Sequence, residues 1–206
     1  MNLGACATLP TIPEVGTWYR AVHPHYLPVA LKTAYTTRYK SRYSPGPGAT
    51  PPFEICYLAE NQVVALFEVE ATFGSPLTPG GLVPNPARPW VVLNVEVMLH
   101  AVVDLTDFSG THSVLNTTVQ ELTGDWKGFH LRSPQTKVKG PLGIAPTQAL
   151  GDALFNAGHV EGFRAVSAKL PYHEVLGVFP QRLRKGSFVK YFYTDSTGIL
   201  QTFAIP

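Results

Sequence analysis

The pattern of apolar and polar positions is clearest between Phe53 and Thr72. Residues 53–59 (FEICYLA) form a short apolar and aromatic run after a segment rich in Pro and Gly, which predicts a mostly buried strand. Asn61 is a suitable helix N-cap, because its side-chain oxygen can accept a hydrogen bond from a free backbone N–H of the first turn. We therefore expect a helix of about ten residues to follow it. This helix is apolar on nearly all sides and yet contains Glu68, so the carboxylate needs a partner or a function.

Short strands account for most of the other apolar runs. Residues 16–22 predict an opening strand that brings Arg20 to one end of a sheet. Residues 90–100 predict a strand with one more polar face, on which Asn94 and Glu96 lie. Further runs with the composition of strands are residues 163–168, 175–179, 188–194 and 199–205. The last two flank the sequence DSTG, which predicts a hairpin turn.

Helices and loops complete the prediction. Helical spacing of apolar residues occurs at residues 28–38, 114–122 and 147–156, with Gly124 and Gly158 as stop signals after the second and third. Residues 44–52 contain four prolines and two glycines, so we expect a surface loop without regular structure. Residues 74–89 and 127–139 are also expected to be irregular.

The composition favours one domain over residues 1–206. With 45% hydrophobic and 15% charged residues the chain can bury a core, and its 19 prolines and 18 glycines favour short elements joined by many turns. The net charge of +2 neither indicates a polyanion-binding protein nor excludes a local basic patch. Neither a run of ~18 apolar residues nor a secretory leader pattern occurs, so we expect a soluble, cytoplasmic protein.

Cysteines and histidines form no pattern typical of a metal site. Cys6 and Cys56 give neither a disulfide framework nor the spacing of zinc ligands. His23 and His25 would face the same side of a strand, but no third ligand lies near them in the sequence. We therefore expect no bound metal ion.

Charged, aromatic and hydroxyl residues recur in four segments: WYRA with Arg20, SRY with Arg42, YLAENQVVALFEV with Tyr57 and Glu68, and GFRAVSA with Ser167. In this order, from about Thr17 to Pro180, the chain resembles the RES domain family, whose name abbreviates Arg, Glu and Ser. The resemblance implies an α+β fold like that of ADP-ribosyltransferases, with mixed β-sheets and flanking helices. It also implies that the protein binds and cleaves NAD+ as the toxin of a bacterial toxin–antitoxin pair, with an Xre-type antitoxin as its partner.

The resemblance implies a role for each of these side chains in NAD+ cleavage. Breaking the nicotinamide–ribose bond passes through an oxocarbenium-like state, and a carboxylate that faces this positive charge lowers the barrier. We assign that role to Glu68. Arg20 and Arg42 would bind phosphate or ribose oxygens, and Tyr57 would stack on the nicotinamide. The hydroxyl of Ser167 would orient Glu68 or bind the ribose, and it need not be a nucleophile.

Several alternatives stay open. Glu68 could lie in solvent or form a structural ion pair, as could Arg20, and Tyr57 could be an ordinary core tyrosine. Arg38 is a rival to Arg42 as the second arginine. The acceptor of the ADP-ribose could be water, phosphate or a protein side chain, which would make the protein a hydrolase, a phosphorylase or a transferase. The oligomeric state, homo- or hetero-oligomeric, also stays open.

A different class of function is that of a non-catalytic nucleic-acid-binding protein. Residues 32–43 interleave basic side chains (Lys32, Arg38, Lys40 and Arg42) with Tyr35, Tyr39 and Tyr43. This pattern is typical of a surface that binds phosphates and stacks on bases. The small net charge argues against it. For a RES toxin, contact with nucleic acid would be only indirect, through the antitoxin.

Overall fold

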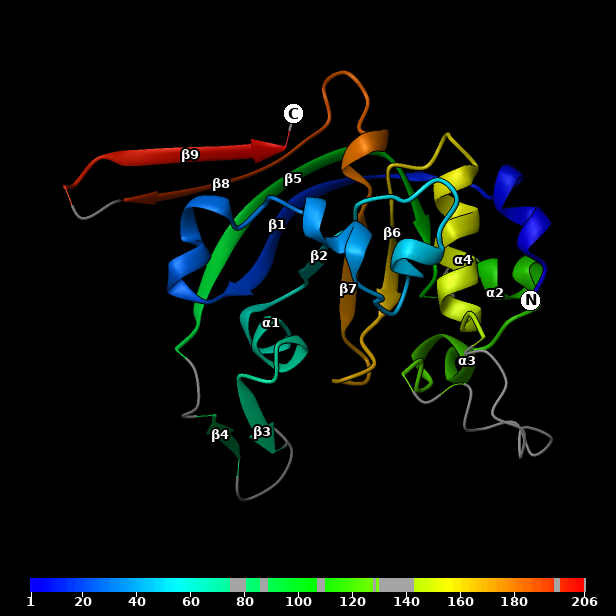
Figure 1. Cartoon of the computed structure of the whole chain (residues 1–206), viewed down its shortest axis with the longest axis horizontal. Coiled ribbons are helices and arrows are strands. Elements are labelled where there is room, and N and C mark those ends of the chain that lie inside the picture. Colours follow the sequence, from blue (N-terminus) through cyan, green and yellow to red (C-terminus); the bar gives the residue numbers. More distant parts are fainter. Residues whose placement is uncertain are drawn as a thin grey trace.

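A mixed sheet of seven strands forms the centre of the computed structural model, which describes residues 1–74, 81–85, 89–106, 110–127, 129, 143–194 and 197–205 (Figure 1). The strands are β1 (Ile12–Val22), β2 (Cys56–Ala59), β5 (Val91–Asp104), β6 (Gly162–Val166), β7 (Glu174–Val178), β8 (Phe188–Thr194) and β9 (Leu200–Ile205). Their order is β1-β2-β7-β6-β5-β8-β9, and β1 also pairs with β5. Strands β1, β2, β7, β6 and β5 therefore form a closed circuit. A separate small hairpin pairs β3 (Thr72–Gly74) with β4 (Leu82–Pro84).

The α-helices pack on one face of this sheet. They are α1 (Gln62–Glu68), α2 (Thr111–Leu115), α3 (Val119–Thr123) and α4 (Pro146–Asn156). The 3₁₀ helices are η1 (Leu3–Thr8), η2 (Pro24–Val29), η3 (Ala34–Arg38), η4 (Gly46–Gly48) and η6 (Pro180–Arg182). Leu27 of η2 packs on the other face. In Figure 1, α2, α3 and α4 lie together near the N-terminus, and α1 lies apart from them, between β2 and β3. Within the described ranges, no helix is both long and apolar enough to cross a membrane.

Two hydrophobic clusters pack on opposite faces of the sheet. The first joins residues of α1 and α4 to β2 and β6, and in it Phe53 stacks on Phe155 with 4.7 Å between ring centroids. The second contains Leu58 of β2 and Val95 of β5, packed against Leu31. Since neighbouring residues of a strand point to opposite faces, β1, β2, β5 and β7 contribute to both clusters. The α+β prediction is confirmed.

The predicted strands are confirmed, with some shifted ends. On β5, Asn94 and Glu96 are exposed between buried neighbours, as the alternation indicated. Strand β2 begins at Cys56 and not at Phe53, because the preceding N–H of Ile55 donates to Thr36 Oγ1 (3.1 Å) and is not available to a neighbouring strand. Parts of 74–89, 127–139 and the DSTG turn lie outside the described residues.

The predicted helix over residues 28–38 is wrong. The chain forms two 3₁₀ helices there instead. The first, η2, ends at Val29, and the second, η3, begins at Ala34. Threonine hydroxyls compete with helical hydrogen bonds: Thr36 Oγ1 donates to the Thr33 carbonyl at 2.7 Å, and Thr33 Oγ1 donates to Glu54. Pro28 lies inside η2 and removes another donor.

Residues 44–52 are only in part the surface loop that we expected. Four of the nine residues (44–46 and 49) are buried, with Ser44 fully buried and Ala49 4% exposed, and the other five are exposed. Gly46 has a φ of +61°, and a Cβ there would lie 2.8 Å from the Tyr39 carbonyl carbon. Only glycine fits this close approach of two backbone segments.

The helix after Asn61 forms but spans only seven residues. Asn61 caps it as expected, with its side chain accepting a hydrogen bond from the Val64 N–H (3.0 Å). The helix ends at Glu68 because Glu70 adopts a left-handed conformation with a φ of +58°. The N–H groups of Glu70 and Ala71 then donate to the carbonyls of Phe67 (3.0 Å) and Leu66 (2.8 Å), which is a Schellman motif. Glu68 is thus the last helical residue and is exposed, not embedded in the middle of the helix.

Residues 114–122 form two short helices and not one. Asn116, with a φ of +51°, ends α2, and the Thr118 side chain caps α3 by accepting a hydrogen bond from the Glu121 N–H (3.2 Å). The helix predicted over residues 147–156 is confirmed by α4, and Gly158 follows it with a φ of +78°.

Glu161 is a buried carboxylate that no sequence pattern singled out. It is 0% exposed and accepts hydrogen bonds from the N–H groups of His100 (2.6 Å), Ala101 (2.9 Å) and Arg184 (2.7 Å). Burial alone would raise its pKa, but these donors lower the pKa below its ordinary value of about 4.5. The carboxylate therefore ties β5 to the segment before β8.

We expect Glu161→Gln to lower the free energy of unfolding at pH 7 by about 2–3 kcal/mol, because the amide NH₂ faces a backbone N–H. Since the folded pKa is depressed, the stabilisation is present above pH 4.5 and is lost as the pH falls through the folded value. Urea unfolding from pH 7 to pH 3 measures both effects. The difference in the free energy of unfolding between wild type and variant should become smaller below pH 4.5. A difference that does not change with pH would contradict this assignment.

Candidate active site

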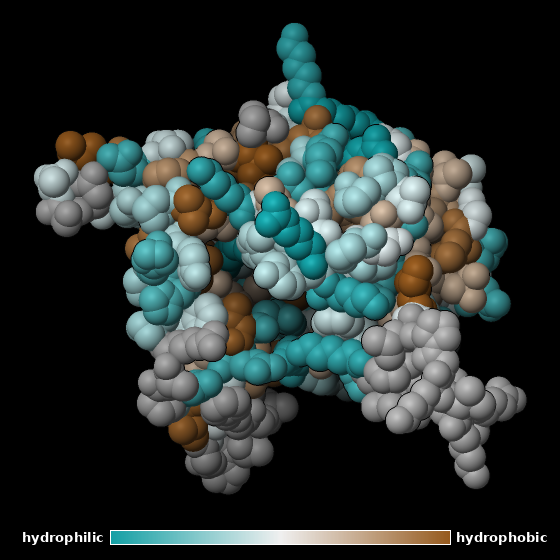
Figure 2. All heavy atoms as spheres, in the orientation of Figure 1, coloured by the Kyte–Doolittle hydropathy of each residue, from teal (hydrophilic) through white to brown (hydrophobic). Residues whose placement is uncertain are grey.

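A pocket of about 1310 Å³ opens where β1, β2, the end of α1 and the segment after β6 meet. Figure 2 shows the hollow on this face of the molecule, with hydrophilic side chains at its rim. Four of the five side chains singled out in the sequence line it, namely Arg20, Arg42, Tyr57 and Glu68. Ser167 is 1% exposed and lies behind the wall formed by its neighbours Val166 and Ala168.

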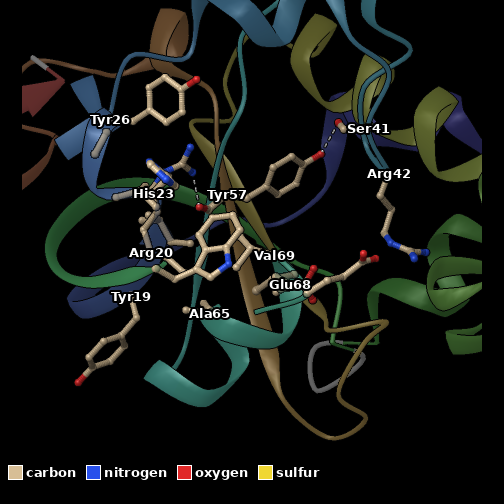
Figure 3. A pocket seen from close by; sticks show the side chains of 18 of the residues that line it. Tyr19, Arg20, His23, Tyr26, Ser41, Arg42, Tyr57, Ala65, Glu68 and Val69 are labelled. Carbon is tan, nitrogen blue, oxygen red and sulfur yellow. Dashed lines mark hydrogen bonds between the residues drawn. The ribbon is translucent and has the colours of Figure 1, made fainter. Parts of the chain in front are cut away.

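Arg20 spans the gap where β1 and β2 diverge. These strands pair only at Tyr19 and Ala59, which leaves the Tyr57 carbonyl without a partner on β1. The Nη1 of Arg20 donates to that carbonyl at 2.7 Å, and its Nη2 donates to the Tyr35 hydroxyl at 3.4 Å (Figure 3). The Nε–H is buried and has no hydrogen-bond partner among the residues that the structure describes. The guanidinium therefore joins the two strands where they line the pocket.

Tyr57 is held by its hydroxyl group. Its Oη forms a hydrogen bond with Ser41 Oγ (2.8 Å) and accepts another from the Tyr43 N–H (3.2 Å). Burial raises the pKa of Tyr57 to about 12, so the phenol stays neutral at physiological pH. Gln148, itself 2% exposed, donates from Nε2 to the Ser41 carbonyl (3.0 Å) and supports this arrangement from α4. The ring is thus fixed along one side of the pocket (Figure 3).

Arg42 lines the pocket, and Arg38 does not. The Nη1 of Arg42 donates to the carbonyls of Gly124 (2.7 Å) and Leu122 (3.2 Å) at the C-terminal end of α3. These carbonyls have no helical partner and favour a cation. Arg38 is exposed on η3 and is not among the lining residues. Of the two arginines that the sequence left open, Arg42 is the one placed with Glu68 and Tyr57.

Glu68 and Ser167 are in direct contact, although they lie 99 residues apart in the chain. The Ser167 hydroxyl donates to Glu68 Oε1 at 2.6 Å, and its oxygen accepts hydrogen bonds from the N–H groups of Lys169 (3.2 Å) and Leu170 (3.1 Å). Because both N–H groups occupy the lone pairs of the hydroxyl oxygen, its proton points at the carboxylate. Ser167 therefore orients Glu68, and its own hydroxyl is buried behind the pocket wall.

Other residues of the pocket were missed in the sequence. Ser41, in the SRY segment, lines the pocket. Gln148 lies outside the pocket lining but supports Ser41 from α4, and no spacing in the sequence indicates this contact. Glu70 and Lys169 line the mouth of the pocket and form an ion pair of 2.5 Å. The sequence does contain one indication of their role, which is spacing: Glu70 follows Glu68 by two residues, and Lys169 follows Ser167 by two residues.

The segment proposed as a nucleic-acid surface is divided by the fold. Tyr35 and Tyr39 are exposed, whereas Tyr43 is fully buried and packs on Phe163 with 4.5 Å between ring centroids. The interleaved pattern therefore does not form one continuous surface. Likewise, His23 and His25 lie at the start of η2 and not on a strand, and the His25 N–H donates to His23 Nδ1.

Two comparisons with known proteins found a match for this chain. The family model described as "RES domain" matches residues 17–191. The structure is similar to a chain in the crystal structure of the M. tuberculosis MbcT-MbcA toxin–antitoxin complex, with a TM-score of 0.61 and 21% sequence identity, over 98% of this chain and 88% of that chain. At this identity the similarity concerns the fold. No curated protein matches the chain. The match of the family model over most of the chain shows that the protein belongs to the RES domain family.

Proposed function

We propose that this protein is the toxin of a toxin–antitoxin pair and that it acts in the cytoplasm by cleaving the nicotinamide–ribose bond of NAD+. The observation that supports this most directly is the Glu68 carboxylate, fixed by Ser167 and exposed at the pocket. The pocket, at about 1310 Å³, exceeds the roughly 300–1,000 Å³ of most small-molecule sites and suits an extended dinucleotide.

Cleavage of the nicotinamide–ribose bond is favoured by a fixed negative charge beside the ribose. As the bond to nicotinamide breaks, positive charge develops on the sugar, and nicotinamide leaves as a neutral molecule. A carboxylate held in place before the reaction stabilises this charge without reorganising. The hydrogen bond from Ser167 fixes one oxygen of Glu68, and the other oxygen is available to a ribose hydroxyl.

The remaining side chains would bind the rest of the substrate. The guanidinium groups of Arg20 and Arg42, which line the pocket, provide donors and positive charge for the pyrophosphate. Tyr57, held by Ser41 and Tyr43, offers a rigid aromatic face on which the nicotinamide would stack. No group in the pocket distinguishes water, phosphate and a protein side chain as the acceptor.

The proposal is tested by incubating the purified protein with NAD+, with and without inorganic phosphate. Mass spectrometry of the products then identifies the acceptor: ADP-ribose indicates hydrolysis, its 1″-phosphate indicates phosphorolysis, and a mass increase of the protein fraction indicates transfer. Release of nicotinamide in any of these arms supports the proposal. NAD+ that stays intact in all of them, including with a bacterial lysate as acceptor, would reject it.

We propose an antitoxin of the Xre type, encoded next to this protein, as its partner. The structural neighbour comes from a toxin–antitoxin complex, which supports a partner of this class. An end of the antitoxin chain would enter the pocket and exclude NAD+. Expression of the protein alone should arrest growth, and co-expression with the neighbouring gene product should restore it. No change in growth or NAD+ turnover on co-expression would contradict the pairing.

Ser167→Ala is expected to lower kcat by about 10–100-fold with little change in KM, because the carboxylate of Glu68 loses the donor that orients it. Steady-state kinetics of nicotinamide release measures this. Ser44→Ala is a matched control, since Ser44 is also buried and also accepts a backbone hydrogen bond, from Gly46, but lies outside the pocket. Equal losses in both variants would indicate a general effect on folding.

A further inference from the structure

We propose that the ion pair between Glu70 and Lys169 positions the catalytic carboxylate of Glu68, an inference that rests on the function proposed above. Glu70 follows Glu68 by two residues, and Lys169 follows Ser167 by two residues. The two segments are therefore joined twice, by the hydrogen bond from Ser167 to Glu68 (2.6 Å) and by the ion pair (2.5 Å).

The Ser167 turn connects these two contacts. The N–H of Lys169 donates to Ser167 Oγ at 3.2 Å, so the backbone of Lys169 aligns the hydroxyl while its side chain holds Glu70. The contacts close a ring that runs from Glu68 through Ser167 and Lys169 to Glu70. A shift of the turn relative to the end of α1 would break the hydrogen bond to Glu68 unless the ion pair opposed it.

The backbone conformation of Glu70 indicates that its side chain serves a purpose other than stability. Its φ of +58° places it in the left-handed region, at the position of the Schellman motif where glycine is favoured. The side chains of Glu70 and Lys169 are 60% and 38% exposed, and ion pairs exposed to this extent contribute little to stability. Glycine would relieve the strain and lose only a weak surface interaction.

The charge of Glu70 is present at physiological pH. The hydrogen bond and charge of Lys169 lower the pKa of the Glu70 carboxyl below its ordinary value, and the charge of Lys127 lowers it further. Both partners line the same pocket as Glu68, so the charged pair lies beside the carboxylate that it is proposed to position.

The variant Glu70→Gly distinguishes an effect on the position of Glu68 from an effect on the stability of the protein. We expect its melting temperature to equal or exceed that of the wild type, while kcat for nicotinamide release from NAD+ falls by roughly tenfold and KM stays within about twofold. Lys169→Met should give the same fall in kcat. The exchanged pair Glu70→Lys with Lys169→Glu restores the contact with reversed charges and should recover most of the lost kcat. Glu96→Gln, which breaks the exposed pair with Lys190 away from the pocket, should leave kcat unchanged.

A readout without substrate tests the same inference. The N–H groups of Lys169 and Leu170 are bound to Ser167, so hydrogen–deuterium exchange over residues 166–173 should be faster in Glu70→Gly than in the wild type. Unchanged exchange together with unchanged kcat would overturn the inference. A lower KM at unchanged kcat would also overturn it, because Lys169 would then be freed to bind substrate. If the wild type itself releases no nicotinamide, the proposed function fails, and the exchange measurement still decides whether the pair holds the turn.

Discussion

Glu68→Gln is expected to lower kcat for nicotinamide release by about a thousandfold without destabilising the protein. The amide keeps the shape of the side chain, and its oxygen can still accept the hydrogen bond from Ser167, which the carboxylate accepts at 2.6 Å. What is lost is the negative charge that faces the developing oxocarbenium ion. Since Glu68 is the last residue of α1 and is exposed, no buried charge network is broken.

Kinetics of nicotinamide release, together with growth arrest on expression, measure this effect. Glu96→Gln serves as the control for the same chemical change, because Glu96 is an exposed residue of β5 outside the pocket. The melting temperature of both variants should lie close to that of the wild type. Retention of wild-type turnover by Glu68→Gln would remove Glu68 from the catalytic machinery.

Arg20→Ala is expected to lower kcat/KM for NAD+ by about a hundredfold, mainly through KM. A charge-assisted hydrogen bond contributes about 1.5–3 kcal/mol, and each 1.4 kcal/mol corresponds to about tenfold in affinity. The variant also leaves the Tyr57 carbonyl without its donor, so we expect a decrease of about 1 kcal/mol in the free energy of unfolding. Arg20→Lys keeps the charge but cannot reproduce the fork, and it should be intermediate in kcat/KM.

The two contributions of Arg20 are separated by measuring binding and stability in parallel. Calorimetric titration with NAD+ in the Glu68→Gln background gives the affinity without turnover, and urea unfolding gives the stability. Arg38→Ala is the matched control, because this exposed arginine lies outside the pocket. A loss of stability with unchanged affinity would make Arg20 a purely structural residue that joins β1 to β2.

Much of the fold follows from local signals in the sequence. Asn61 marks the start of α1 because a cap needs only its own side chain and the next turn, and Gly158 marks the end of α4 for a similar reason. The exposed positions Asn94 and Glu96 follow from simple alternation along β5. In each case the residues that determine the structure are neighbours in the chain.

Some errors concern contacts between residues that are distant in the chain, and others concern local backbone conformations that residue type does not indicate. Strand β2 starts late because a hydroxyl 19 residues away, that of Thr36, takes the N–H of Ile55. Glu70 ends α1 in a left-handed conformation that glycine usually adopts, so the residue type at this position did not predict the end of the helix. For the site, residue type indicated Glu68 and Arg20, but the support of Tyr57 by Ser41 and Gln148 depends on packing that the sequence does not display.

The contact between Glu68 and Ser167 also bears on when such a protein can become harmful during translation. Its two partners are separated by 99 residues, and the second comes from the last quarter of the chain. A nascent polypeptide that has not yet emerged beyond Ser167 lacks the oriented carboxylate, as does any product of premature termination before that codon. Under the proposed function, the cell is therefore not exposed to the activity until synthesis of the chain is nearly complete, and a partner protein made at the same time has that interval to fold.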